Sequence, residues 1–380
     1  MPTPRRPRIL VSTPYPIGPP THGGRVRVAG LASGLAAAGA DVTLLAPWHP
    51  ARGARHAPDG VALRRHRLAA NLLPAVVPEA LASPQALLSF QPLAWGPRRT
   101  LRELGEFDAY QFDFCAQARW MDLVPEKAAV VYSAHNVEAD FVGLQPRASW
   151  PAAAARRRIE RLERRAAERA DLVVTCSEAD AARMHELYRV RSAHVAPNGP
   201  QGLRPGAGRR NEVRRRLRLR PDDLAVLFVG GDSAHNREAA RFLADEVAPH
   251  MGEGTRLLLA GRSSRAADDD SDRVTKLGWV DDLPGLLAAA DLGVNPVAAA
   301  EGSSVKVADF LAAGLPVVAT PDGARGAEGG SAVTVVSREG FARAVTARSP
   351  PGEDERPPSW AATGERLLAE IEAAVRSRRR

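Results

Sequence analysis

Residues 291–320 read DLGVNPVAAAEGSSVKVADFLAAGLPVVAT, a stretch in which apolar runs alternate with glycine, proline and serine. A short apolar run at 292–297 predicts a buried strand. After a loop, Ser303 or Ser304 suits the N-cap of a helix, whose apolar positions recur at helical spacing until Gly314. PVVAT then predicts the next strand, and this alternation of strand and helix indicates a parallel sheet.

The start of this helix is a candidate anion site, because free backbone N–H groups point outward there with the positive end of the helix dipole. Lys306 stands in the first turn, where the dipole disfavours a cation, and a bound anion would explain its position. Glu301 and Asp309, with seven residues between them, could hold hydroxyl groups on either side of a phosphate. The alternative is that Lys306 and Asp309 form only a surface ion pair.

The acid-x7-acid spacing after a proline-containing strand, followed by AAGLPVVAT, resembles the donor-site segment of retaining glycosyltransferases of family 4. GSSVK is similar to the branch of that family in which a G-S-x-x-K loop precedes the helix. The resemblance implies the GT-B fold, in which two doubly wound, Rossmann-like α/β domains face each other across a cleft.

The resemblance also assigns roles to this segment. Glu301 would hold hydroxyls of the donor sugar and Asp309 the ribose, although the family's usual second acid is the longer Glu. The donor diphosphate would lie against the rest of the loop and the helix start, which comprise Gly302, Ser303, Ser304 and Lys306.

The N-terminal part begins with a similar unit. RILVST at 8–13 predicts a buried strand, a helix is expected from near Arg25 to Gly39, and 41–46 predicts a second strand. Gly24 lets the backbone approach a ligand closely, but the glycine spacing is not the dinucleotide fingerprint G-x-G-x-x-G. A plain tight turn is the alternative, whereas the Gly-Gly loop resembles the cleft-facing loop of family 4 enzymes.

His135 follows a strand predicted at 128–133, and open α/β sheets place their ligands at the carboxyl ends of the strands. It could donate a hydrogen bond to a sugar hydroxyl or act on the acceptor, although a lone histidine is more often structural. HNVE at 135–138 looks like the family's cleft motif. The resemblance therefore implies that His135 and Gly24 line the sugar and acceptor side.

A second α/β unit is expected from residue 224 onward. Its first strand ends at Gly230 and Gly231, which the resemblance places against the donor, and Asn236 is expected to start the next helix. The common form of the family carries an Arg and a Lys here for the donor diphosphate, and this chain has no Lys in the stretch. The charge would then fall to Lys306 and to Arg262 or Arg237.

Trp279 and Val280 follow a predicted strand in the same unit. They resemble the positions that flank the nucleotide base, although Trp279 could instead be a core residue. Together these segments predict an N-terminal, acceptor-side domain at 1–200, a Gly-, Pro- and Arg-rich linker at 201–223, and a nucleotide-sugar-binding domain at 224–350. Residues 351–380 predict a flexible stretch, a helix expected to pack back on the N-terminal domain, and a disordered basic end.

Composition limits the classes of function. The 380 residues are 44% hydrophobic and 25% charged, which is ordinary for a globular protein of two domains. Two cysteines exclude a disulfide framework and fit a reducing cytoplasm, and we expect neither a signal peptide nor a membrane-spanning segment.

The net charge of +8 leaves phosphorylated substrates, anionic lipid surfaces and nucleic acid open. Four Tyr and nine Phe, without aromatic–basic interleaving, argue against a nucleic-acid partner. An Arg-rich helix predicted at 151–170 is either a solvated face or a contact with an anionic membrane, which would place the protein at the inner membrane face.

The resemblance thus implies an enzyme of glycan biosynthesis. It would transfer a sugar, with retention, from a nucleotide-diphosphate donor to a hydroxyl of a glycan, lipid-linked or small-molecule acceptor. The nucleotide sugar is a co-substrate, no cofactor is expected, and no Asp-x-Asp motif at a strand end calls for a metal. Two alternatives stay open: a catalytically inactive, nucleotide-sugar-binding partner subunit, and a nucleotide-sugar epimerase on the same fold.

Overall fold

Two parallel β-sheets organise the chain, one in each of two units. Unit 1 comprises Met1–Pro197 and Pro358–Arg380, and unit 2 comprises Asn198–Pro357. The computed structural model describes residues 5–14, 17, 23–47, 57–66, 100–143, 149–201, 208–268, 271–298, 303–327, 330–347 and 357–380, with only the backbone at 141–143 and 149–155. Parallel strands joined by helices give each unit the Rossmann-like character that the sequence predicted.

Unit 1 contains a seven-stranded sheet in the order β3-β2-β1-β4-β5-β6-β7, in which all neighbours are parallel. The strand order reverses between β1 and β4. Phe112 and Tyr132 point into the core on one face, and Ala109 and Val131 into the core on the other. The elements are β1 Arg8–Ser12, α1 Gly23–Ala37, β2 Asp41–Pro47, β3 Ala62–His66, β4 Ala109–Asp113, the 3₁₀ helix η5 Cys115–Leu123, β5 Ala129–Ser133, α4 Glu138–Gly143, α5 Ser149–Arg169, β6 Leu172–Thr175, α6 Glu178–Tyr188, β7 Ala193–Val195 and α12 Trp360–Arg378.

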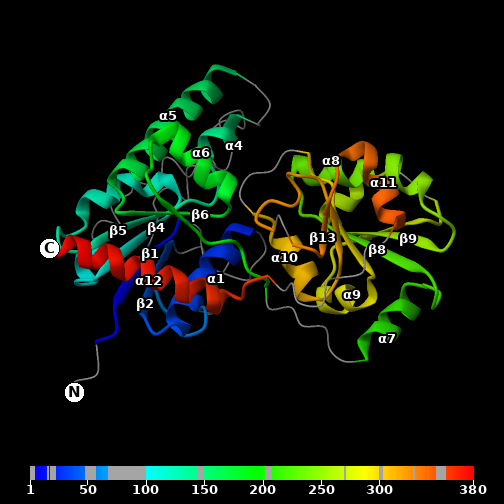
Figure 1. The fold of residues 1–380 in the computed structure, drawn as a ribbon, viewed down its shortest axis with the longest axis horizontal. Coiled ribbons are helices and arrows are strands. Elements are labelled where there is room, and N and C mark those ends of the chain that lie inside the picture. The colour runs from blue at the N-terminus through cyan, green and yellow to red at the C-terminus, as the bar shows by residue number, and fades with distance from the viewer. Residues whose placement is uncertain are drawn as a thin grey trace. The chain divides into compact units, whose positions relative to one another are not determined.

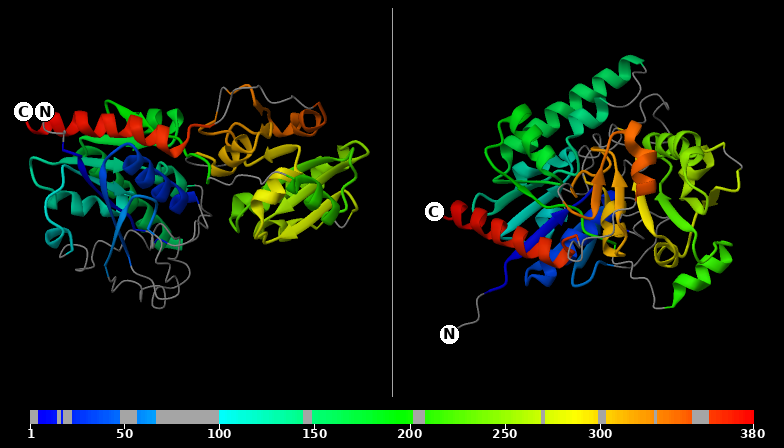
Figure 2. Two further views of the ribbon diagram at one scale, coloured as in Figure 1. Left: turned by 90° about the horizontal axis from the view of Figure 1, so that it is seen from below. Right: turned by 45° about the vertical axis from the view of Figure 1, so that its right-hand side comes forward.

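The last helix, α12, belongs to unit 1 and packs on α1 (Figures 1 and 2). Glycines allow the close approach, because a Cβ at Gly34 would lie 2.1 Å from the carbonyl oxygen of Trp360, and one at Gly364 would lie 2.1 Å from the carbonyl carbon of Gly34. Leu367 and Ile371 complete the core that this helix shares with α1.

The basic end of the chain is helical, so the expectation of disorder there was wrong. Arg378 lies in the last turn of α12, and its Nε donates a hydrogen bond of 2.7 Å to Asp171. Arg379 donates one of 2.5 Å to Asp108. These carboxylates, on segments distant in the sequence, hold the end of the chain on unit 1. None of the helices in the described part of the chain is long and apolar enough to cross a membrane.

Unit 2 contains a six-stranded parallel sheet in the order β10-β9-β8-β11-β12-β13, which reverses between β8 and β11. The opening stretch of the sequence folds here as a strand, a helix and a strand, and Gly314 (φ +78°) ends the helix in a conformation that glycine readily adopts. The elements are α7 Arg209–Arg216, β8 Leu224–Val229, α8 Ala234–Phe242, the π-helical η6 Leu243–Val247, the 3₁₀ helix η7 Ala248–His250, β9 Thr255–Ala260, the 3₁₀ helix η8 Arg262–Ala266, β10 Val274–Gly278, α9 Leu283–Ala289, β11 Leu292–Asn295, α10 Val305–Ala312, β12 Val317–Ala319, β13 Val333–Val335 and α11 Arg338–Ala347.

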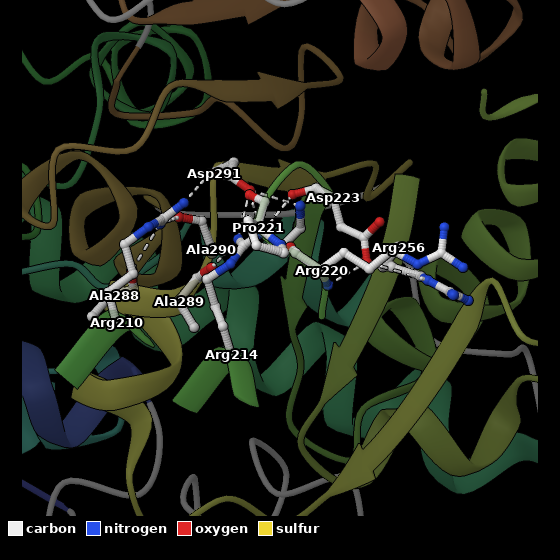
Figure 3. Close-up of polar contacts among 11 residues, drawn as sticks. Arg210, Arg214, Arg220, Pro221, Asp223, Arg256, Ala288, Ala289, Ala290 and Asp291 are labelled. Carbon is white, nitrogen blue, oxygen red and sulfur yellow. Dashed lines mark hydrogen bonds and ion pairs between the residues drawn. The ribbon is translucent and has the colours of Figure 1, made fainter. Parts of the chain in front are cut away.

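Part of the stretch expected to be a linker forms α7, and arginines fasten it to the end of α9 (Figure 3). Arg210 and Arg214 donate hydrogen bonds to the carbonyls of residues 288–290, at 2.8 to 3.0 Å. Both also reach Asp291, whose carboxylate accepts from the backbone N of Ala225 at 2.8 Å. The arginines thereby satisfy carbonyls left free at the end of α9 and place positive charge at the negative end of its dipole.

Candidate functional site

Two helix N-termini lie at the carboxyl edge of the sheet in unit 2. α8 follows β8 and α10 follows β11, the neighbouring strands between which the order reverses. Ser233 caps α8 by accepting from the backbone N of Asn236, and Ser304 caps α10 by accepting from that of Val307, both at 3.4 Å. Because open α/β sheets bind ligands beside such a reversal and helix N-termini favour anions, this edge can hold a phosphate.

Of the two residues predicted as candidate caps, Ser303 and Ser304, the structure has Ser304 as the N-cap, whereas the helix start expected at Asn236 was wrong. α8 begins at Ala234, and Asn236 lies in its first turn with a buried side chain. Ser233 is the better cap because its short side-chain hydroxyl can accept a hydrogen bond from a backbone N–H in the first turn of the helix. The side-chain amide of Asn236 is therefore left for another partner.

Lys306 connects the starts of the two helices. Its Nζ donates a hydrogen bond of 2.7 Å to Oδ1 of Asn236 and lies 4.6 Å from the centre of the Phe228 ring. Desolvation lowers the pKa of Lys306 to about 7, so neutral and charged forms of this side chain coexist near pH 7. Lys306 therefore bonds to Asn236 rather than to Asp309, and a plain surface ion pair is not the arrangement found.

His235, which also lies at the start of α8, adds no charge. His235 Nε2 lies 2.9 Å from Ser233 Oγ, and burial together with the charge of Lys306 lowers the pKa of His235 to about 4. His235 is consequently neutral at pH 7. Arg237, which the sequence offered as a further cation, pairs with Asp232 at 2.5 Å on the exposed side of α8.

The first residues of unit 2 bind the start of α10. Asn198 donates from its backbone N to Ser303 Oγ (3.0 Å) and from Nδ2 to the Ser303 carbonyl (2.9 Å). Gln201 donates to both carboxylate oxygens of Asp309, from its backbone N at 2.7 Å and from Nε2 at 2.6 Å. Burial raises the pKa of Asp309, and these two hydrogen bonds oppose that shift. The acid expected to hold a ribose is thus engaged by its own chain.

Trp279 lies at the carboxyl end of β10 with 62% of its surface exposed, so the alternative of a core residue was wrong. Its Nε1 donates to Asp281 at 2.8 Å, and the exposed guanidinium of Arg262 lies 5.8 Å from the ring centre. Val280, next to it, is partly buried. An indole held in this way presents an aromatic surface on which a base can stack.

The two glycines after β8 differ in what surrounds them. A Cβ at Gly230 would lie 2.3 Å from Ser263 Oγ, and a Cβ at Gly261 (φ +89°) would lie 2.1 Å from the Gly230 carbonyl oxygen. Gly230 therefore serves the close packing of the ends of β8 and β9. Gly231 is exposed, and a Cβ there would meet nothing within 4 Å, which leaves room for a ligand.

The roles expected of Glu301, Gly302 and Gly24 stay predictions. Glu301 and Gly302 lie outside the described residues, so their roles stay predictions. Gly24 lies, partly exposed, in the first turn of α1, where the part expected of it is likewise a prediction. Across the described ranges, no three His, Cys, Asp or Glu side chains lie together as metal ligands would.

His135 in unit 1 is buried just beyond the carboxyl end of β5. Its Nε2 lies 3.6 Å from Oδ1 of Asp113, which ends β4. Glu163 on α5 lies at the start of the next helix: its carboxylate accepts from the backbone N of Glu138 (2.8 Å) and of Ala139 (3.0 Å), which fixes the first turn of α4. Sequence reasoning did not select Asp113 or Glu163. An acid directly after the aromatic-rich stretch AYQF at 109–112 was a usable signal for Asp113, whereas nothing local marks Glu163.

Two Rossmann-like units, with helix N-termini that can hold a phosphate at the strand reversal in unit 2, are an architecture common among nucleotide-binding proteins. Residues 21–200 match the model of Glycosyltransferase Family 4, and residues 223–348 match that of Glycosyl transferases group 1. The chain belongs to this family of glycosyltransferases. Curated protein sequences give no match.

Solved structures share the fold at low sequence identity. HepE from Anabaena, in complex with UDP and glucose, is 15% identical with a TM-score of 0.63, over 98% of each chain. Sucrose-phosphate synthase from Thermosynechococcus elongatus is 19% identical with a TM-score of 0.64, over 98% of this chain and 97% of the other. WaaG, a glycosyltransferase involved in lipopolysaccharide biosynthesis, is 16% identical with a TM-score of 0.61, over 98% and 94%. The fold is therefore GT-B.

Proposed function

We propose that this glycosyltransferase moves a sugar, with retention of anomeric configuration, from a nucleoside-diphosphate donor to a hydroxyl of a glycan, lipid-linked or small-molecule acceptor. The observation that carries the proposal is Lys306, held by Asn236 where α8 and α10 begin. A desolvated ammonium beside two helix N-termini suits a ligand with about two negative charges close together. The donor diphosphate is such a ligand, and HepE, with the same fold, has been solved with UDP.

The chemistry of transfer explains why a cation is needed here. The bond between the anomeric carbon and the diphosphate oxygen breaks, and a bond from that carbon to the acceptor oxygen forms. The acceptor's proton passes to the departing diphosphate, which meanwhile gains negative charge. Lys306 and the N-terminus of α10 stabilise this charge, and stabilisation that grows toward the transition state raises turnover.

Other residues contact the base, the sugar and the phosphates of the donor. Trp279 stacks on the base beside Val280 and Arg262, and Gly231 leaves space for the backbone to approach. Glu301 and Gly302 hold the donor sugar and its phosphate, and His135 serves the transferred sugar and the acceptor. No metal is proposed, so EDTA should leave transfer unchanged, and rescue of EDTA-treated enzyme by a divalent cation would contradict this point.

A thermal-shift screen with UDP-, GDP-, ADP- and TDP-sugars tests the proposal and identifies the base. A ligand at a hundred times its Kd stabilises the folded state by about 2.7 kcal/mol, so the matching donor should raise Tm clearly. Lys306→Ala should lose most of this shift. Lys276→Ala, which changes the other lysine of unit 2, is the matched control and should keep it.

The stabilising donor is then assayed for transfer with a panel of acceptors. Release of nucleoside diphosphate together with a glycosylated product supports the proposal, and the anomeric configuration of that product tests retention. Binding without turnover of any donor would instead favour an inactive partner subunit. Conversion of the donor into another nucleotide sugar, with no acceptor used, would identify an epimerase.

A further inference from the structure

A cluster of buried polar side chains lies at the carboxyl ends of β4 and β5 in unit 1. Gln111, Asp113 and Ser133 are 0% exposed and His135 is 7% exposed. Asp113 and Ser133 are partners in the parallel register of β4 and β5, so their side chains stand side by side on one face of the sheet. β4 borders the strand reversal at β1, where sheets of this type bind ligands.

The contacts within the cluster centre on one carboxylate. Oδ1 of Asp113 accepts from Nε2 of Gln111 at 3.2 Å and lies 3.6 Å from Nε2 of His135. The second distance is slightly longer than a hydrogen bond, and such contacts in catalytic sites often tighten only when substrate is present. Because a carboxylate only accepts hydrogen bonds, it favours the imidazole tautomer that carries its proton on Nε2.

Three other polar atoms of the cluster have no hydrogen-bond partner within the part of the chain that the structure describes. Oδ2 of Asp113, Oε1 of Gln111 and Oγ of Ser133 are all buried, and none has a partner among the described residues. Leaving one such group unsatisfied costs about 1 to 3 kcal/mol, and folded proteins rarely do so. Three together indicate that water or a ligand group completes the cluster. The chemistry selects a hydroxyl, because it can donate to the carboxylate and exchange a hydrogen bond with the serine.

The backbone after Asp113 is held in an unfavourable conformation. Phe114 has φ +81° and ψ +137°, a combination that residues with a Cβ rarely adopt. Such residues cost about 1 to 3 kcal/mol and persist where the surrounding structure requires them, often at functional sites. Its N donates to the Ser133 carbonyl at 3.2 Å, which ties the end of β4 to that of β5 directly beside the cluster.

We propose that this cluster binds a hydroxyl of the glycosyl substrate and that Asp113 is the positioning residue that fixes His135 with its proton on Nε2. This inference rests on the proposed function and adds Asp113 and Ser133 to its site. Held in this way, His135 presents Nδ1 as a hydrogen-bond acceptor for a hydroxyl. An anionic group is excluded from the cluster because Asp113 would repel it.

The tautomer can be tested without any assay of activity. In ¹⁵N-labelled full-length protein, long-range ¹H–¹⁵N NMR spectra in alkaline buffer distinguish the two ring nitrogens, and His135→Gln identifies the His135 signals. Wild type should show the proton on Nε2, and Asp113→Asn should lose that preference. A proton on Nδ1 in wild type, or the same tautomer in both proteins, would overturn the inference.

The hydroxyl is tested with deoxy analogues of the donor sugar and of the acceptor. One analogue should lower kcat/KM in wild type by about tenfold or more, the effect of one lost hydrogen bond, and should cost far less in Ser133→Ala. Ser133→Ala and Asp113→Asn should leave the thermal shift by the free nucleoside diphosphate unchanged. Asp108→Asn, at the opposite end of β4, is the control and should keep wild-type turnover per folded molecule.

The outcomes separate this inference from the proposed function. Transfer by wild type, with every deoxy analogue affecting wild type and Ser133→Ala equally, would overturn the hydroxyl site while the glycosyltransferase assignment stands. Absence of turnover with every donor would refute the proposed function. In that case the NMR experiment still supports or overturns the role of Asp113 toward His135.

Discussion

Asp309 on α10 accepts hydrogen bonds from Gln201 on both of its carboxylate oxygens, at 2.7 and 2.6 Å. Gln201 stands in the first few residues of unit 2, directly after the chain leaves unit 1 at Pro197. The same carboxylate is the one that the resemblance to family 4 assigns to a ribose. A ribose at this position would have to share the carboxylate of Asp309 with Gln201 or displace Gln201 from it. Through these two hydrogen bonds, Asp309 anchors the chain where it enters unit 2.

We predict that Asp309→Asn destabilises unit 2. The new amide would place an NH₂ group against one of the two donors of Gln201, and hydrogen bonds to a charged group contribute about 1.5 to 3 kcal/mol. Urea denaturation compared with wild type measures the loss, with Asp281→Asn on the surface as the control. Unchanged stability together with lost binding of nucleoside diphosphate would instead favour ribose binding as the main role of Asp309.

We predict that Lys306→Ala lowers kcat by at least about a hundredfold, the effect of removing one charge-stabilising donor from a transition state. Donor affinity should fall less, because the interaction strengthens as the leaving group gains charge. Lys306→Arg should recover only part of the rate, since a planar guanidinium fits poorly where a compact ammonium contacts Asn236 and Phe228. Steady-state kinetics decide, and a kcat within threefold of wild type in Lys306→Ala (roughly 0.7 kcal/mol) would remove Lys306 from the site.

Binding of nucleoside diphosphate should take up a proton. The pKa of Lys306 is about 7 in the free protein, and a bound diphosphate favours the ammonium. Affinity should therefore fall as pH rises above about 7, by up to tenfold per pH unit. Calorimetry in buffers of different ionisation enthalpy measures the uptake, which should vanish in Lys306→Ala.

The same residue should affect stability with the opposite trend. Its pKa in the folded protein is below the unfolded value, so the unfolded chain binds more protons between pH about 7 and 10.5. The contribution of Lys306 to stability therefore increases as pH rises through that range. A pH-independent difference in stability between wild type and Lys306→Ala would contradict the lowered pKa.

Glu163 should make unit 1 less stable as pH rises. Burial raises the pKa of Glu163 to about 7, against the hydrogen bonds from Glu138, Ala139, Tyr188 and Tyr132 that lower it. The folded state therefore binds more protons than the unfolded state between pH about 4.5 and 7, and a shift of this size corresponds to about 3 kcal/mol lost across that window.

Thermal unfolding of Glu163→Gln measured across the window checks this prediction. The variant should be destabilised, because its amide faces two backbone N–H donors, but its stability should depend less on pH. Glu168→Gln, an exposed position on the same helix, should keep the wild-type profile. Equal pH profiles for Glu163→Gln and wild type would show that Glu163 is ionised throughout.

The Arg-rich face of α5 should bind anionic vesicles. Arg156 and Arg157 are exposed, and the pKa of Arg158 is lowered by burial and by the nearby charges of Arg119 and Arg161. Such crowding of like charge is relieved beside an anionic surface. Changing the three arginines at 156–158 to Gln should weaken sedimentation of the protein with phosphatidylserine vesicles. The three consecutive arginines at 214–216 on α7 are unsuitable as a control, because Arg214 is buried.

A matched control instead changes Arg215, Arg216 and Arg218 to Gln, which removes the same charge from unit 2. The control should bind vesicles like wild type, and both variants should turn over a soluble donor at the wild-type rate. Equal loss of vesicle binding in the two variants would mean that total charge, rather than the face of α5, attracts the membrane.

The local elements and their alternation could be predicted from the amino-acid sequence alone. Apolar runs, glycine stops and serine caps predicted β11, α10 and β12 and the cap at Ser304, because these features depend on residues only a few positions apart. The sequence also indicated the family, since the spacing of Glu301, Lys306 and Asp309 is a local motif. The helix α7 and the helical end of α12 were not predicted, because their stability comes from arginines that form hydrogen bonds with distant segments.

The contacts of those residues, by contrast, follow from the way in which distant segments pack together. Lys306 meets Asn236 because β8 and β11 are neighbours in the sheet although they are far apart in the chain. Asp309 meets Gln201 across a separation of 108 residues in the chain. The pairing of Asp113 with His135 likewise depends on the register of β4 against β5. Desolvation, which sets the pKa of Lys306, arises only when such distant segments pack together, so no local pattern of residues encodes it.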